Sequence, residues 1–268
     1  MLSSHWYKSC LSANPSAGRG EFDMTWRSGA RVRVAAVGDP HLGADNGDLY
    51  REHWEQLGGQ ADMLLVAGDL TKTGTVAEGQ FAAAVFGQLP VPVVAVLGNH
   101  DYHSGRCARI IALLRECGVT VLDGQATVLE VRGRRVGIAG TVGFGGGFVG
   151  KSASAFGETE MKLFVRRTER QADALKAALR SLDSDARIAL THYAPTSDTL
   201  AGEPPEIHPF LGSYQLGEAI DSHAVDLAIH GHAHFGSQHG ATLHGTPVRN
   251  AATSVIGRAF AVYELPGL

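Results

Sequence analysis

The sequence lacks the features that mark disulfide-stabilised, membrane-spanning and strongly basic proteins. It has three cysteines in 268 residues, with no CxxC pair, which argues against a disulfide framework and favours a reducing compartment. No run approaches the ~20 apolar residues that a membrane-spanning helix needs. The formal net charge of -4 gives no overall attraction to nucleic acid or to an acidic membrane. We therefore expect a cytoplasmic protein that has neither a membrane segment nor a nucleic-acid ligand.

The N-terminal segment also lacks the apolar core of a secretory signal peptide. Scattered Ser, Gly, Asn and Pro residues instead predict a flexible leader over residues 1–28, in which Met24 offers an alternative start. No internal repeat and no low-complexity linker divides the rest of the chain. Residues 29–268 are therefore expected to form one domain.

Apolar runs alternate with helical patterns along the chain, which favours an α/β fold. Strands that end in polar turns are expected at 32–37, 62–67, 93–97, 186–190 and 226–229. Further strands are expected at 119–122, 126–131, 135–139, 242–250 and 258–264. Helices are expected at 48–60, 75–89, 104–117, 158–182 and 215–223, with Thr75 and Glu78 as a capping box. The segments expected to be loops are 141–157 and 196–213.

Five of these strands end in polar side chains that a protein core does not tolerate without partners. In chain order, these side chains are Asp39 and His41, Asp69, Asn99 with His100 and Asp101, His192, and His232 with His234. Strand ends that meet at one edge of a sheet are where α/β folds place ligands. Carboxylates, imidazoles and an amide without a thiolate suit Mn, Fe, Zn, Ni or Co better than a closed structural zinc site.

The spacing of these residues favours two metal ions. Asp39-x-His41 and His232-x-His234 each place two side chains on the same side of an extended segment. About eight ligand contacts, counting a carboxylate that bridges, are too many for one ion with an open position. They fit two ions ~3.5–4 Å apart, an arrangement used for phosphoryl chemistry.

The ordered set of motifs resembles the calcineurin-like metallophosphoesterase family over residues 32 to 264, about the whole predicted domain. The matching motifs are Asp39-x-His41, Gly68-Asp69, Gly98-Asn99-His100-Asp101, His192 and Gly231-His232-x-His234. The resemblance implies an α/β fold of the metallophosphoesterase type, a double β-sheet sandwich flanked by helices in α-β-β-α layers.

The resemblance also implies a role for each motif residue. A first metal ion would be held by Asp39, His41 and His234, a second by Asn99, His192 and His232, with Asp69 bridging the two. Both Asn99 and His100 would contact the substrate, and His100 would touch the phosphate or protonate the leaving oxygen. The carboxylate of Asp101 would orient the ring of His100.

The implied activity is hydrolysis of phosphate esters by a metal-activated hydroxide, with two divalent or trivalent ions whose identity the motifs do not specify. We favour a phosphodiesterase that acts on a small, nucleotide-like diester, because the chain is compact and not basic. The alternatives are a phosphomonoesterase, acting on a protein or a small molecule, and a non-catalytic metal-binding scaffold. No oligomeric state is predicted.

Three other sequence patterns are not assigned to this site. The residue His230 precedes the glycine of its motif, so we assign it to the end of the strand and not to the metal. The segment Gly145-x4-Gly150-Lys151-Ser152 matches a nucleotide-binding P-loop literally, but no buried strand leads directly into it, so a loop near the site is preferred. Lys162 and the pair Arg166-Arg167 are interpreted as a solvated helix face.

Overall fold

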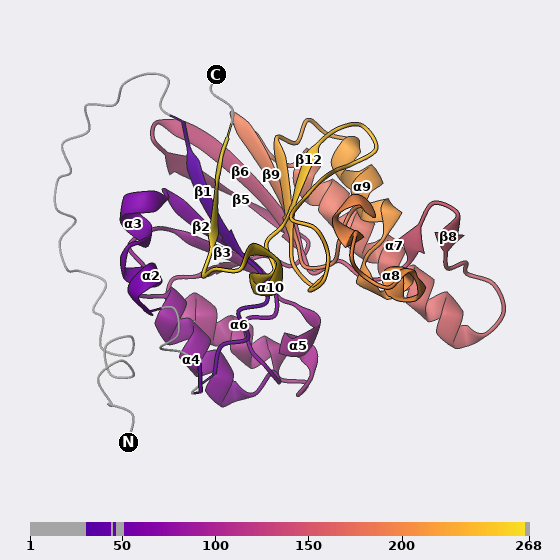
Figure 1. The fold of residues 1–268 in the computed structure, drawn as a ribbon, viewed down its shortest axis with the longest axis horizontal. Coiled ribbons are helices and arrows are strands. Elements are labelled where there is room, and N and C mark those ends of the chain that lie inside the picture. The colour runs from indigo at the N-terminus through magenta and orange to yellow at the C-terminus, as the bar shows by residue number, and fades with distance from the viewer. Residues whose placement is uncertain (1–30, 44, 47–50, 266–268) are drawn as a thin grey trace.

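The computed structural model describes residues 31–43, 45–46 and 51–265 (Figure 1). The leader predicted for residues 1–28 and residues 48–50 of the first predicted helix lie outside this part of the chain. The division into a leader and one domain over 29–268 stays a prediction. Within the described ranges, no helix has both the length and the apolar character that crossing a bilayer requires.

Two mixed β-sheets face each other in the centre of the molecule. The first has the strand order β13-β1-β2-β3-β4, in which only β13 runs antiparallel to its neighbour. Its strands are β1 (Arg33–Val37), β2 (Met63–Ala67), β3 (Val93–Val96), β4 (Thr120–Val121) and β13 (Ala261–Glu264). The near-continuous Val, Ala and Leu runs of β1 to β3 are typical of parallel strands that are buried on both faces.

The second sheet has the order β11-β12-β10-β9-β6-β5, with the two edge strands β11 and β5 antiparallel to their neighbours. Its strands are β5 (Gln125–Val131), β6 (Arg134–Thr141), β9 (Ala186–Thr191), β10 (Leu227–His230), β11 (His239–Ala241) and β12 (Pro247–Asn250). The strands predicted at 126–131 and 135–139 are β5 and β6, which form a hairpin at Gly133.

Helices cover the outer face of each sheet, as Figure 1 shows. The first sheet packs against α2 (Arg51–Glu55), α3 (Leu57–Gln60), α4 (Val76–Phe86) and α6 (Cys107–Glu116). The second packs against α7 (Thr159–Arg180) and α9 (Tyr214–Asp221). Between the sheets lies a layer of buried side chains that includes Val34, Met63, Leu65, Ile138, Ile188 and Ile229. The predicted α-β-β-α layers are therefore confirmed.

The capping box predicted for the helix at 75–89 is present in α4. The hydroxyl of Thr75 accepts a hydrogen bond from the Glu78 amide at 3.3 Å, and the Glu78 carboxylate accepts one from the Thr75 amide at 3.1 Å. These bonds satisfy two of the amide groups that the first turn of a helix leaves without partners.

Short elements account for most differences from the prediction. Of the strand predicted at 242–250, only 247–250 forms a strand, β12; the preceding residues form the turn from β11, in which the Thr242 hydroxyl accepts from the Thr246 amide. Three segments that lack a periodic apolar pattern form one-turn helices: α5 (Asn99–Tyr102), α8 (His208–Leu211) and α10 (Thr253–Ile256). Two 3-10 turns, η1 (Asp198–Leu200) and η2 (Pro205–Ile207), precede α8 in the predicted loop 196–213.

The glycine-rich segment 141–157, predicted to be a loop, contains a small hairpin of β7 (Gly147–Phe148) and β8 (Lys151–Ser152). Here Lys151 and Ser152 lie in an exposed strand and not at the start of a helix, where a P-loop places the corresponding residues. The literal P-loop match is therefore not a phosphate-binding loop of that kind.

Candidate metal centre

The polar ends of five strands meet at one edge of the two sheets. The register pairs Val37 with Val66 and Ala67 with Val96, so the strands β1, β2 and β3 end level with one another. Main-chain hydrogen bonds continue past the strand ends, from His41 N to Asp69 O at 3.0 Å and from Gly231 N to His192 O at 3.2 Å. The first sheet thus supplies three of the predicted motifs, the second supplies two, and all five face the same space.

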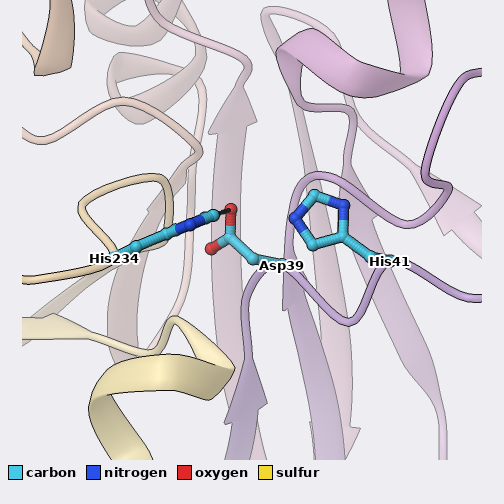
Figure 2. Close-up of side chains that lie close together, drawn as sticks. All are labelled: Asp39, His41 and His234. Atoms are coloured by element: carbon cyan, nitrogen blue, oxygen red, sulfur yellow. Dashed lines mark hydrogen bonds and ion pairs between the residues drawn. The ribbon is translucent and has the colours of Figure 1, made fainter.

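The predicted ligands other than Asn99, together with His100, which was predicted to contact the substrate, form three overlapping groups whose candidate ligand atoms lie within 4.8 Å of one another. The groups are Asp39, His41 and His234; His41, Asp69 and His100; and Asp69, His192 and His232. Figure 2 shows the first group, with the Asp39 carboxylate between the two imidazole rings. The Nε2 atom of His234 lies 3.1 Å from Oδ1 of Asp39. Each predicted carboxylate and imidazole ligand therefore belongs to at least one group.

Backbone strain is concentrated at these ligands. Among the described residues, five that are not glycine have a positive φ, and four of these are predicted ligands: Asp39 (56°), His41 (43°), Asp69 (51°) and His232 (68°). Such conformations cost of order 1–3 kcal/mol each and persist only where the surrounding structure fixes them. One such restraint is the bond from the His232 amide to Oδ2 of Asp39, at 2.8 Å.

Close packing of the motif segments explains two of the motif glycines. A Cβ atom added to Gly98 would lie 2.1 Å from Oδ1 of Asp69, and one added to Gly231 would lie 2.5 Å from Oδ2 of Asp39. Both contacts are shorter than atoms tolerate. Only glycine at these two positions therefore lets the carboxylates lie against the main chain of the neighbouring motif.

Main-chain carbonyl groups orient the imidazole rings. Nδ1 of His192 lies 2.9 Å from the carbonyl oxygen of Ala67, and Nδ1 of His41 lies 3.3 Å from that of Thr71. Because a carbonyl oxygen only accepts, the hydrogen of each neutral ring is assigned to Nδ1. The Nε2 atom of each ring is then left with a lone pair that faces the centre of the site.

Two further rings follow the same rule. Nδ1 of His100 lies 2.6 Å from the Lys72 carbonyl oxygen, and Nε2 of His232 lies 3.3 Å from that of Phe210. His232 is therefore bonded through the opposite nitrogen and presents Nδ1 as its free lone pair. These orienting partners were not predicted, because any residue can supply a main-chain carbonyl and no sequence signal marks it.

The resulting arrangement fits a metal cation. With Nδ1 of His192 protonated, its Nε2 lone pair lies 2.8 Å from the amide oxygen of Asn99 and 3.5 Å from Oδ1 of Asp69. All three atoms are then electron-rich, and no hydrogen lies between them. A cation bound among them removes this repulsion, and the nitrogen and oxygen donors are of the kind that first-row transition metals prefer.

The ionisation states also suit metal binding. Burial by itself would raise the pKa of Asp39, but its hydrogen bond to His234 and the nearby His192 bring that pKa down to about 2. Burial, with a smaller effect of His192, lowers the pKa of His232 to about 3. At neutral pH the aspartate is therefore charged and the imidazole is neutral, which are the forms that bind metal ions.

The role predicted for Asp101 is wrong. Its carboxylate is fully buried and accepts from the amides of Gly98, Leu70 and Thr71 and from the Thr71 hydroxyl. His100 instead donates from Nδ1 to the Lys72 carbonyl. Asp101 is the third residue of the one-turn helix α5, so its side chain returns to the start of that helix and binds the neighbouring turn. Burial nevertheless raises the pKa of Asp101 to about 6.

The interpretation of His230 is confirmed. It is the last residue of β10, is fully buried, and lies in none of the three ligand groups. Its Nδ1 donates to the Gly231 carbonyl at 2.7 Å, and its Nε2 accepts from the Thr199 hydroxyl at 2.8 Å. Both ring nitrogens are therefore occupied within the protein.

The first prediction concerns metal binding. We expect Mn²⁺ to raise the melting temperature of the metal-stripped protein, with a stabilisation of about 3 kcal/mol once the ion exceeds its Kd about 100-fold. Asp69→Asn should remove most of this gain because it removes the charge shared by two groups. Thermal denaturation with and without EDTA measures the effect, with Glu130→Gln on exposed β5 as the control. An equal Mn²⁺ response in wild type and Asp69→Asn would contradict the site.

The second prediction concerns Asp101. Asp101→Asn should lower the unfolding free energy of the metal-free protein by about 2–4 kcal/mol, because an amide NH₂ cannot accept from the donors around the carboxylate. Urea denaturation measures this loss, and Asp123→Asn serves as a control without such a cluster of donors. If Asp101→Asn kept full stability but changed the orientation of the His100 ring, the orienting role of Asp101 would be restored.

Comparison with known proteins identifies the family of the chain. The family model for calcineurin-like phosphoesterases matches residues 32–236. No match was found among curated protein sequences. The phosphopantetheinyl hydrolase PptH from Mycobacterium tuberculosis is similar in fold, with a TM-score of 0.62, 14% identity, and coverage of 85% of this chain and 91% of that chain.

A second similar structure is GAP50, the anchor in the inner membrane complex of Plasmodium. It has a TM-score of 0.51 and 15% identity, and the match covers 84% of this chain and 72% of that chain. At these identities the two structures show a shared fold alone. Since the family model covers most of the chain and all five motifs, the chain belongs to the calcineurin-like phosphoesterase family of metal-dependent hydrolases.

Proposed function

We propose that the chain is a phosphodiesterase that uses two metal ions to hydrolyse a small, nucleotide-like phosphodiester. The observation that carries the proposal is the position of Asp69, which belongs to two of the three ligand groups. A carboxylate shared in this way is suited to bridging two ions. When bound, such ions lower the pKa of a shared water and neutralise the oxygens of the phosphoryl group.

The proposed division of ligands follows the groups in the structure. One ion would be held by Asp39, His41 and His234, and the other by Asn99, His192 and His232, with Asp69 between them. The amide oxygen of Asn99 lies beside His192, and the Asn99 amide would also contact the substrate. Five strand ends fix these side chains, so little reorganisation is needed when the phosphate binds.

The proposed proton donor to the leaving oxygen is His100. Its side chain is 44% exposed, its Nδ1 is held by the Lys72 carbonyl, and its Nε2 lies 3.8 Å from Oδ2 of Asp69. With Nδ1 bonded to the carbonyl, the protonated form of the ring would carry a hydrogen on Nε2 that can be given to the departing oxygen. Here the Lys72 carbonyl provides the orientation that had been assigned to Asp101.

Two exposed phenyl rings support a diester over a monoester. Phe210, which is 61% exposed, accepts the bond from His232 at its carbonyl group, and Phe235, which is 75% exposed, directly follows His234. Large apolar rings beside a polar site are suited to bind the organic part of a ligand. One exposed phenylalanine adjoins a ligand of each proposed ion, through its carbonyl group or along the chain, and this matches a phosphate with two organic substituents.

A substrate panel tests this proposal. With the Mn²⁺-loaded protein, kcat/KM should be at least about 10-fold higher for bis-p-nitrophenyl phosphate than for p-nitrophenyl phosphate, because the second ring contact is lost in the monoester. The panel also includes cyclic nucleotides. It further includes a substrate with a phosphopantetheinyl group, because the similar hydrolase from Mycobacterium tuberculosis is named for that group. A reversed preference would indicate a phosphomonoesterase, and metal binding without any turnover would indicate a scaffold.

The His100→Ala variant tests the proton donor. It should keep its metal ions but lose about 10²–10⁴-fold in kcat for esters with alkoxide leaving groups, and much less for p-nitrophenolate, which leaves without a proton. Initial rates over a series of leaving groups measure the difference. His103→Ala, an exposed residue at the end of α5, is the control. An equal loss for every leaving group would argue against an acid role.

A further inference from the structure

A row of rings leads from the metal centre to a positive charge on α7. The Tyr193 ring lies 4.4 Å from the His232 ring and 5.7 Å from the Phe144 ring, measured between centroids. The guanidinium carbon of Arg167 then lies 4.4 Å from the centroid of Phe144. Two rings therefore separate a proposed metal ligand from an arginine that the sequence had assigned to a solvated helix face.

The arginine is held in place without a carboxylate partner. Arg167 is exposed, and in the described part of the chain its contacts are with aromatic rings: Phe144, and Tyr102 at 6.0 Å. A guanidinium stacked on a ring keeps its N–H groups free at its edge. Other arginines, such as Arg33 and Arg135, are bound to aspartates. The guanidinium of Arg167 is therefore held in one position, and its N–H groups remain available to bind a ligand.

The ring of Tyr193 lies between the metal ligands and the guanidinium. Tyr193 is only 8% exposed, and its ring lies 5.5 Å from that of His192. The ring thus forms a fixed wall beside the metal centre, with Phe144 and Arg167 on its other side.

We propose that Arg167 determines substrate specificity by binding a second anionic group, a terminal phosphate, of the diester whose scissile phosphate lies at the metal centre. This inference rests on the proposed function and specifies its substrate class. A guanidinium edge donates two parallel hydrogen bonds to a phosphate, which a solvated lysine does less well. The substrate class is therefore a small diester that carries a phosphate monoester, such as a phosphorylated dinucleotide.

Calorimetry with two nucleotides tests the site without turnover. AMP and adenosine 3′,5′-bisphosphate share one nucleoside and differ by one phosphate. The Mn²⁺-loaded full chain should bind the bisphosphate about 10-fold more tightly than AMP, and Arg167→Gln should remove most of that difference. Equal affinities of the wild type for the two ligands would overturn the proposal.

Three variants separate the charge of Arg167 from its packing and from the general field of the helix. Arg166→Gln makes the same change of charge at the neighbouring exposed position, which has no ring contact in the described structure, and should keep the preference. Arg167→Met keeps the bulk over Phe144 and should lose the preference, whereas Arg167→Lys should keep part of it. A preference that survives Arg167→Met, or that Arg166→Gln abolishes, would overturn the assignment.

The same protein distinguishes this inference from the proposed function. Wild-type turnover of bis-p-nitrophenyl phosphate, which has no second anion, tests the phosphodiesterase alone. If that turnover is present and the two nucleotides bind equally, only the Arg167 site fails. If the ester is not hydrolysed, the phosphodiesterase fails, and the calorimetric difference still decides whether Arg167 binds a second phosphate.

Discussion

The crowding of lone pairs around the buried carboxylate of Asp69 is the constraint on which the rest of the site depends. This side chain is 1% exposed, and the Nε2 atoms of His192 and His41 lie 3.5 and 4.0 Å from its oxygens. Without cations, this arrangement brings electron-rich atoms together in a place where water screens them poorly. The fold must therefore hold the site open against repulsion, and metal ions turn the same contacts into attraction.

What holds the site is the main chain more than the side chains. The strands end level with one another, and hydrogen bonds join the motif segments beyond those ends. Main-chain carbonyl groups also fix the orientation of the imidazole rings. The left-handed conformations of Asp39, His41, Asp69 and His232 show that local preference is overruled at these positions. The core between the two sheets offsets that cost, because its apolar side chains are almost entirely buried. Stability is thus located in the sheets, and the strained residues lie at their edge.

The ligands could be predicted from the sequence because polar residues directly after apolar strands are costly unless they are used. The same reasoning gave the two-sheet architecture through the family resemblance. It could not give the direction of Asp101, since the turn of α5 decides whether a side chain faces the ring of His100 or the start of the helix. The hairpin at Gly147–Phe148 and Lys151–Ser152 was missed because so few residues show no alternation. Carbonyl partners such as that of Lys72 carry no residue signature.

The residue proposed to determine substrate specificity could not be predicted from the sequence either. In the sequence, Arg166 and Arg167 are equivalent members of a basic helix face, and both are exposed in the structure. Only contacts with aromatic rings distinguish them, above all that of Arg167 with Phe144, which comes from the segment between β6 and α7. Strand ends are fixed by sheet register and so define the reaction class, whereas the flanking helix and loops are free to vary without disturbing the metal ligands. The choice of substrate can therefore change in this fold while the chemistry at the sheet edge stays the same.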